Sequence, residues 1–278
     1  MNDASVVVAL LTPFAEDGRP DMVALHHHVE WLVHAGVDAV MPAGTTGEGP
    51  LLEEDEVVAC VATAAAAAAG RIAVLAHVGR AGTDATIRLA HRTVGAGALG
   101  VSAVVPYYYA VDEGHLVEHY RALRGAVPDV PVYAYTIPAR TGNELSPAAA
   151  GKLAQAGLSG LKDSTKSMER HVEYLEATRD HPFRVLMGSD GMVLDALRAG
   201  AAGCVSAVAN ARPDLLVGLT RAFLGGRVEE AERHQAEVTA VREKLSRGPS
   251  LAGIKRATAR ALADAGTDYP VRLRPPLG

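Results

Sequence analysis

Short apolar runs alternate with longer amphipathic stretches over most of the chain, and this pair recurs about every 25 to 35 residues. Eight runs have this form: 6–11, 39–41, 72–77, 101–105, 132–136, 160–161, 184–187 and 203–205. The first, third, fourth and fifth are rich in Val and Ile, which is typical of strands buried on both faces. The pattern therefore predicts eight short strands separated by helices.

The stretches between the runs have the spacing and the boundary residues of helices. The stretch 22–35 carries its larger apolar residues near one face. Ser146 and Pro147 predict an N-terminal cap followed by proline at the first helical position. Asp84 is expected to cap a helix over 84–96 in the same way.

Eight strand–helix units at this chain length predict a (β/α)8 TIM barrel, which we place over residues 1–212 as the catalytic core. Three further amphipathic stretches, at 214–224, 228–245 and 251–263, predict a C-terminal helical subdomain over 213–278. The alternative fold is an open, doubly wound parallel sheet. That fold favours a Gly-rich loop after the first strand, but Leu11-Thr12-Pro13-Phe14 stands there instead.

Composition narrows the class of partner. Of the 278 residues, 49% are hydrophobic and 21% are charged, as in chains that fold around a core. The formal net charge of −5 argues against nucleic acid or an anionic membrane as the main partner. The longest apolar run, 57–69, is too short to cross a bilayer. The N-terminus lacks the basic start of a signal peptide, so we expect a cytoplasmic protein.

The sequence favours no metal site. Cys60 and Cys204 lie far apart and lack CxxC spacing, which argues against a disulfide framework or a thiolate zinc site. His26, His27 and His28 are adjacent on one predicted helix, where neighbouring side chains point to different faces. We therefore interpret the three histidines as solvated.

A lysine ends the sixth predicted strand, and in a barrel the chemistry lies where strands end. Lys162 follows the apolar Gly160 and Leu161, so its side chain is expected to emerge inside the barrel mouth. Burial favours the neutral amine, which is a nucleophile. The alternative is a structural lysine paired with Asp163 or Glu48.

Two more groups stand at strand ends that face the same mouth. After the second strand, Gly44-Thr45-Thr46-Gly47-Glu48 offers converging backbone N–H groups and two hydroxyls, although such a turn also serves as a plain helix start. Tyr135 ends the fifth strand, where a tyrosine is often packing only. Arg140 follows in the next loop, and its fork suits a carboxylate if it is not simply solvated.

The remaining strand ends carry weaker signals. The segment Gly188-Ser189-Asp190-Gly191 could hold a phosphate or a hydroxyl, or form a turn in which Asp190 caps the next helix. The segment Tyr107-Tyr108-Tyr109 follows the fourth strand, and it is as consistent with a contact between subunits as with a part of the active site.

Together, a lysine, a tyrosine and a Gly-Thr-Thr turn at the ends of strands six, five and two predict Schiff-base chemistry on a 2-oxo acid. The amine attacks the ketone, backbone N–H groups hold the carboxylate, and the phenol moves protons.

The chain resembles the dihydrodipicolinate synthase and N-acetylneuraminate lyase family of pyruvate-dependent class I aldolases. The resemblance covers nearly the whole length and is carried by these motifs in order: Leu11-Thr12-Pro13-Phe14 with Asp17-Gly18, the Gly44–Glu48 turn, Pro106-Tyr107-Tyr108, Tyr135-Thr136-Ile137-Pro138 with Thr141-Gly142, Gly160-Leu161-Lys162-Asp163 and Arg274-Pro275-Pro276-Leu277. It implies a homotetramer built as a dimer of dimers, with no metal or organic cofactor.

The resemblance also implies roles for individual residues. Lys162 would be the Schiff-base lysine, and Tyr135 would transfer protons through Thr46 and through Tyr108 of a neighbouring subunit. Further residues would bind substrate. Thr45 and Gly47, in the Gly44–Glu48 turn, would hold the pyruvate carboxylate, and Gly188 and the backbone carbonyl of Val205 would also face the substrate. Arg140 would bind the carboxylate of the aldehyde.

The identity of the aldehyde partner depends on a few positions. Arg140 is similar to the arginine with which synthases bind aspartate semialdehyde, and both Arg140 and Gly191 argue against sialic acid. Thr136 replaces the usual synthase Asn, and Lys162-Asp163-Ser164 is similar to the sugar-acid aldolase sequence. The loop Gly79-Arg80-Ala81 lacks the Asn of feedback-inhibited enzymes, so we expect weak or absent inhibition by lysine.

The leading hypothesis is a pyruvate-dependent lyase similar to 4-hydroxy-tetrahydrodipicolinate synthase, which joins pyruvate to aspartate semialdehyde. An aldolase for 2-oxo-3-deoxy sugar acids is the alternative within the family. Two hypotheses lie outside it: a catalytically silent barrel that binds a metabolite, and a phosphate-handling barrel that uses the segment 188–191.

Overall fold

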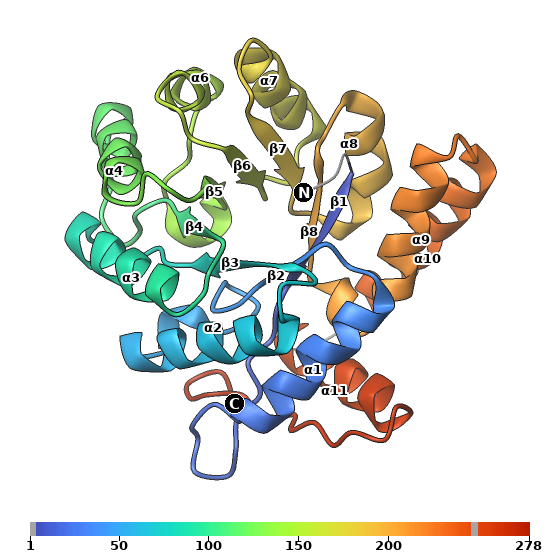
Figure 1. Ribbon diagram of the computed structural model, residues 1–278. Helices are drawn as coiled ribbons and strands as arrows, with labels where there is room; N and C mark the ends of the chain where they lie inside the picture. Colours follow the sequence, from blue (N-terminus) through green and yellow to red (C-terminus); the bar gives the residue numbers. More distant parts are fainter. Residues whose placement is uncertain (1–3, 246–249) are drawn as a thin grey trace.

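Eight parallel strands close into a barrel in the order β1 to β8, with β8 paired back to β1 (Figure 1). The computed structural model describes residues 4–245 and 250–278. The strands are β1 Ser5–Ala9, β2 Ala39–Met41, β3 Ala73–His77, β4 Gly100–Val104, β5 Val132–Thr136, β6 Gly160–Asp163, β7 Arg184–Met187 and β8 Gly203–Ser206. The predicted (β/α)8 barrel is confirmed, and the open doubly wound sheet is wrong.

Helices surround the barrel; those up to residue 199 connect successive strands, and the later ones follow the last strand. They are α1 Met22–Ala35, α2 Glu54–Ala68, α3 Thr83–Gly95, α4 Glu113–Ala126, α5 Pro138–Thr141, α6 Pro147–Gln155, α7 Met168–Thr178, α8 Val193–Ala199, α9 Pro213–Leu224, α10 Val228–Leu245 and α11 Ser250–Ala263, with short 3-10 turns at η1 Gly49–Leu51, η2 Asp190–Met192 and η3 Val208–Asn210. None of the helices in the described ranges is both long and apolar enough to cross a membrane.

The alternation of side chains along β5 and β6 decides which groups enter the barrel. Leu161 packs in the outer core with the helices, so its neighbour Lys162 points inward. Lys162 pairs in register with Tyr135 on β5 and with Leu186 on β7. The layer below the mouth is apolar: Val7, Ala9, Ala39, Met41, Leu75, Tyr133, Leu186 and Val205. The Lys162 side chain therefore lies above an apolar layer.

The C-terminal helices pack in two ways. Leu215, Leu216 and Leu219 of α9 are buried in the same core cluster as the barrel strands. Beyond α9, α10 reaches the top of the barrel through Gln235, which bonds to the backbone of Asp190 and Leu194. In Figure 1, α11 lies beside α1 and the chain ends near the loop between β1 and α1. The division into units 1–212 and 213–278 stays a prediction.

Local expectations differ from the structure at three points. Ser146 caps α6 with Pro147 at its first turn, as predicted, but α3 begins at Thr83 after Gly82 and is not capped by Asp84. The interpretation of the three histidines as solvated is wrong for His28, which is fully buried and bonds through Nε2 to the carbonyl oxygen of Asn210 at 3.1 Å. The N-terminal residues 1–3, on which the expected cytoplasmic location rested, lie outside the described residues.

Candidate active site

Lys162 is a buried amine without a carboxylate partner. Its side chain is 5% exposed, and Nζ lies 4.0 Å from the centroid of the Tyr135 ring. Within residues 4–245 and 250–278, Lys162 forms no ion pair. Burying a cation is costly without a counter-charge, so this setting favours an amine that reacts.

Both carboxylates proposed as structural partners of this lysine are engaged elsewhere. Asp163 contacts His171 Nδ1 at 2.9 Å through Oδ2 and accepts hydrogen bonds from Thr165 through Oδ1. Glu48 pairs with Lys255 at 2.6 Å. The alternative of a structural ion pair at Lys162 is therefore wrong.

The Gly44–Glu48 turn lies beside the tyrosine. Thr45 Oγ1 is 3.4 Å from the Tyr135 hydroxyl oxygen, and Thr45 and Thr46 are both half-buried. The backbone amides of Thr45 and Thr46 donate to no backbone carbonyl among the described residues. The turn thus presents N–H groups and hydroxyls beside the hydroxyl of Tyr135, an arrangement that suits a small carboxylate.

Close packing explains both glycines of the expected binding set. A Cβ at Gly47 would lie 2.7 Å from the Leu10 carbonyl oxygen, and the Gly47 carbonyl accepts a hydrogen bond from Thr12 Oγ1 at 2.7 Å. A Cβ at Gly188 would lie 2.1 Å from Ser164 Oγ. These positions require glycine because neighbouring atoms fill the space of a side chain.

The side of the site near β7 and β8 is formed by Val205 and by the hydrogen-bonded pair of Ser206 and Asp190. Val205 packs in the apolar floor below Lys162. Ser206 Oγ donates to the carboxylate of Asp190, which also accepts from Val208 N at 3.3 Å. Burial raises the pKa of Asp190. Asp190 lies in η2 and fixes β8, so the interpretation of this residue as a simple helix cap is wrong.

His77 is a neighbour of the site that the sequence analysis missed. Its ring lies edge-on to Tyr135 with centroids 6.0 Å apart, and Nε2 accepts a hydrogen bond from Val104 N at 3.2 Å. Burial, and then the charges of Lys162 and Arg80, lower the pKa of His77 to about 3. A neutral imidazole therefore borders the amine. The sequence did carry a signal for it, because His77 is a polar residue at the last position of the apolar run 72–77.

Arg140 and Tyr108 stand apart from the buried group. Arg140 lies exposed on the short helix α5. Tyr108 is 86% exposed, has a φ of 81° and packs edge-to-face against Tyr109. Within the described part of the chain, neither residue forms an ion pair, hydrogen bond or ring contact with Lys162.

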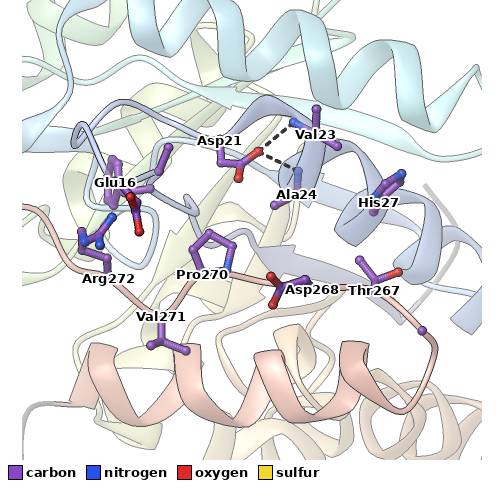
Figure 2. A pocket seen from close by; sticks show the side chains of 13 residues that line it. Glu16, Asp21, Val23, Ala24, His27, Thr267, Asp268, Pro270, Val271 and Arg272 are labelled. Carbon is purple, nitrogen blue, oxygen red and sulfur yellow. Dashed lines mark hydrogen bonds between the residues drawn. The ribbon is translucent and has the colours of Figure 1, made fainter.

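A hollow of about 800 Å³ lies outside the barrel mouth, between the start of α1 and the segment 266–272 (Figure 2). Glu16, Asp21, Asp268 and Arg272 line it, whereas Lys162, Tyr135 and Thr45 do not. Asp21 is occupied there as the cap of α1, accepting from Val23 N and Ala24 N. Among the described residues, no group of three His, Cys, Asp or Glu side chains could hold a metal ion.

The fold and the comparisons with known proteins define the class: the chain is a (β/α)8-barrel enzyme of the pyruvate-dependent lyases. It belongs to the Dihydrodipicolinate synthetase family, whose model matches residues 2–278.

Two curated relatives and two solved structures show the range of the family around this chain. An uncharacterized DapA-like lyase of Halobacterium salinarum is 42% identical over 94% of this chain and 85% of its own length. A 4-hydroxy-tetrahydrodipicolinate synthase of Gluconacetobacter diazotrophicus is 35% identical over 96% of this chain and 94% of its own.

Among the structures, YagE from E. coli K12, solved with pyruvate, has a TM-score of 0.92 at 28% identity and covers 98% of this chain and 92% of its own. A variant of the Sulfolobus solfataricus 2-keto-3-deoxygluconate aldolase has a TM-score of 0.87 at 28% identity, covering 98% and 89%.

Proposed function

We propose that Lys162 forms a Schiff base with pyruvate and that the resulting enamine joins to an aldehyde, in the manner of 4-hydroxy-tetrahydrodipicolinate synthase. The observation that carries the proposal is the buried amine of Lys162, which lies without an ion-pair partner over the ring of Tyr135, whose hydroxyl in turn lies beside Thr45. The synthase of Gluconacetobacter diazotrophicus and the pyruvate complex of YagE support this assignment.

The reaction begins at the neutral amine. Lys162 Nζ attacks C2 of pyruvate to give a carbinolamine, which loses water to form a protonated imine. The iminium withdraws electrons, so a proton leaves C3 and an enamine forms. The Tyr135 hydroxyl moves these protons, and Thr45 Oγ1 at 3.4 Å connects it to the turn that binds the pyruvate carboxylate.

The enamine carbon then attacks the aldehyde carbon, whose oxygen takes up a proton. In the synthase reaction the amino group of aspartate semialdehyde attacks the imine carbon, closes the ring and releases Lys162. Arg140 would pair with the carboxylate of this aldehyde from the rim, because its exposed guanidinium is free to reorient.

The proposal includes a homotetramer in which Tyr108 completes the proton relay of a neighbouring subunit through Thr46. The exposure of Tyr108, its left-handed backbone and the adjoining Tyr109 support a partner at this surface. A cytoplasmic location fits two cysteines, Cys60 and Cys204, that are buried as free thiols. Sedimentation of the purified protein and fractionation of cells would check these two points.

A sugar-acid aldolase is the second candidate. The sequence Lys162-Asp163-Ser164 and the Thr136 beside Tyr135 favour it, as does the similarity to the Sulfolobus 2-keto-3-deoxygluconate aldolase. In that reaction the same enamine forms when a 2-oxo-3-deoxy sugar acid is cleaved to pyruvate and an aldehyde.

Borohydride reduction in the presence of pyruvate tests the Schiff base. The expected result is a covalent pyruvate adduct on Lys162, located by peptide mass spectrometry, and its loss in Lys162→Ala. Lys166→Ala is the matched control, because Lys166 lies exposed four residues away. An adduct that persists in Lys162→Ala refutes the assignment, and no adduct on the wild-type protein favours a silent metabolite-binding barrel.

The aldehyde is identified by pyruvate consumption against a panel that contains aspartate semialdehyde and glyceraldehyde. Faster loss with aspartate semialdehyde supports the synthase, and faster loss with glyceraldehyde supports the aldolase. Binding of phosphate esters without an adduct would instead support the phosphate-handling barrel.

A further inference from the structure

The carboxylate turn is bounded by two residues in an unfavourable backbone conformation. Ala43 has a φ of 59° and Glu48 a φ of 57°, the left-handed region in which a Cβ is crowded. In the described structure, the backbone hydrogen bonds that close residues 43–49 on themselves run from Glu48 N to Thr45 O and from Gly49 N to Gly44 O. A strained turn keeps one shape only when surrounding contacts hold it.

The Glu48 side chain provides such a contact at the C-terminal end of the turn. One carboxylate oxygen lies 2.6 Å from Lys255 Nζ, and both side chains are fully buried. The other oxygen accepts a hydrogen bond from the backbone N–H of Arg274 at 2.9 Å. Charges removed from water are tolerated when a counter-charge and hydrogen bonds replace the water, and Glu48 has the Lys255 ammonium on one oxygen and the Arg274 N–H on the other.

The residues that hold Glu48 are themselves fixed. Lys255 Nζ donates to the Arg272 carbonyl at 2.6 Å and lies 4.3 Å from the centroid of the Phe14 ring. The Arg274 guanidinium then joins this segment to the barrel: it forms a bidentate pair with Glu56 of α2 and donates to the carbonyls of Leu51 and Gly18.

The same segment borders the hollow drawn in Figure 2, where Arg272 lies near Glu16. The loop between β1 and α1 and the segment 268–274 therefore adjoin each other along the outside of the turn. The C-terminal region thus contacts the end of the turn at Glu48, through Lys255 and the backbone of Arg274.

We propose that Glu48 and Lys255 are positioning residues for the substrate carboxylate, and that the C-terminal segment serves the active site by holding the Thr45–Thr46 turn through this buried pair. The inference rests on the proposed function for the identity of the carboxylate, which is that of pyruvate. Neither side chain touches the reacting atoms, so both act through the amides and hydroxyls of the turn.

Hydrogen exchange of the peptide that spans 43–52 tests the positioning directly, whatever the substrate. Lys255→Met breaks the pair, and Glu48→Gln with Lys255→Met removes both charges and their burial cost. We expect faster exchange at the backbone amides of positions 48 and 49 in both variants. Val238→Ala, which removes a buried contact from α10, an element that carries neither residue of the pair, is the control for lost stability alone and should leave this exchange unchanged.

The pyruvate concentration that gives half-maximal borohydride trapping tests the link to substrate. We expect it to rise roughly tenfold in Lys255→Met, because a displaced turn no longer matches the carboxylate. It should stay raised in the double variant, even where the melting temperature recovers, and remain at the wild-type value in Val238→Ala.

Unchanged exchange in both pair variants would overturn the positioning role. Faster exchange with an unchanged half-saturating concentration would overturn the role in substrate binding. A wild-type protein that is not trapped at all would refute the proposed function, while the exchange experiment would still decide whether the pair holds the turn.

Discussion

Lys162 and Tyr135 face each other across adjacent strands, with the lysine Nζ 4.0 Å from the centre of the phenol ring. The ring face is negative, so it stabilises the positive charge that develops on nitrogen as the imine forms. The hydroxyl at the far end of the same ring lies beside Thr45 Oγ1. One side chain therefore contributes a surface for the amine and a group for proton transfer.

Two substitutions of Tyr135 distinguish the role of its ring face from the role of its hydroxyl. Tyr135→Phe keeps the ring and loses the hydroxyl, so we expect kcat to fall by about 10²- to 10³-fold while borohydride still traps pyruvate on Lys162. Tyr135→Leu loses both, and trapping should also slow. Steady-state rates and the time course of trapping distinguish the variants. Equal trapping rates in Tyr135→Phe and Tyr135→Leu would show that the ring face has no role.

The subunit relay predicts a contrast between neighbouring tyrosines. Tyr108→Phe removes the hydroxyl proposed to reach the next subunit, so kcat should fall roughly tenfold to a hundredfold without a change in sedimentation. Tyr109→Phe, on the same exposed loop, should retain activity. If both variants behave alike, the relay through Tyr108 is wrong.

Arg140 predicts a selective effect on the second substrate. Arg140→Ala should raise KM for a carboxylate-bearing aldehyde by about tenfold or more, since a charge-assisted hydrogen bond is lost. KM for pyruvate and the melting temperature should not change, because Arg140 is exposed and is not part of the turn proposed to bind pyruvate. An equal rise in both KM values would place Arg140 outside the aldehyde site.

The buried His28 predicts how stability depends on pH. Burial lowers the pKa of His28 from 6.5 to about 4, so the unfolded chain takes up this proton first as the pH falls. At this group the unfolded state then binds more protons than the native state, so the contribution of His28 to the free energy of unfolding decreases from about pH 6.5 towards pH 4.

His28→Gln keeps a donor for the Asn210 carbonyl and removes the titration. Denaturant unfolding between about pH 5 and 6 should show a slope smaller by about 1 kcal/mol per pH unit than in the wild-type protein. Since the other titrating groups are common to both proteins, an identical slope would mean that His28 is not buried neutral.

The eight apolar runs and the glycines and prolines between them determined the barrel, because strand and helix periodicity is local and each run carries its own signal. The same local order placed Lys162, Tyr135 and the Gly44–Glu48 turn at strand ends. Closure of the sheet then requires the carboxyl ends of the strands to share one mouth, so the sequence alone groups these residues.

Only the tertiary structure decided what each polar group pairs with. The sequence left Glu48 and Asp163 as partners for Lys162, but packing sends Glu48 to Lys255, more than two hundred residues away in the chain, and Asp163 to His171. His77 and His28 were likewise invisible as buried neutral groups. The partner and the burial of each polar group depend on contacts between distant segments, which local patterns do not encode. The periodicity that predicts the strands and helices of the barrel, by contrast, is a property of neighbouring residues.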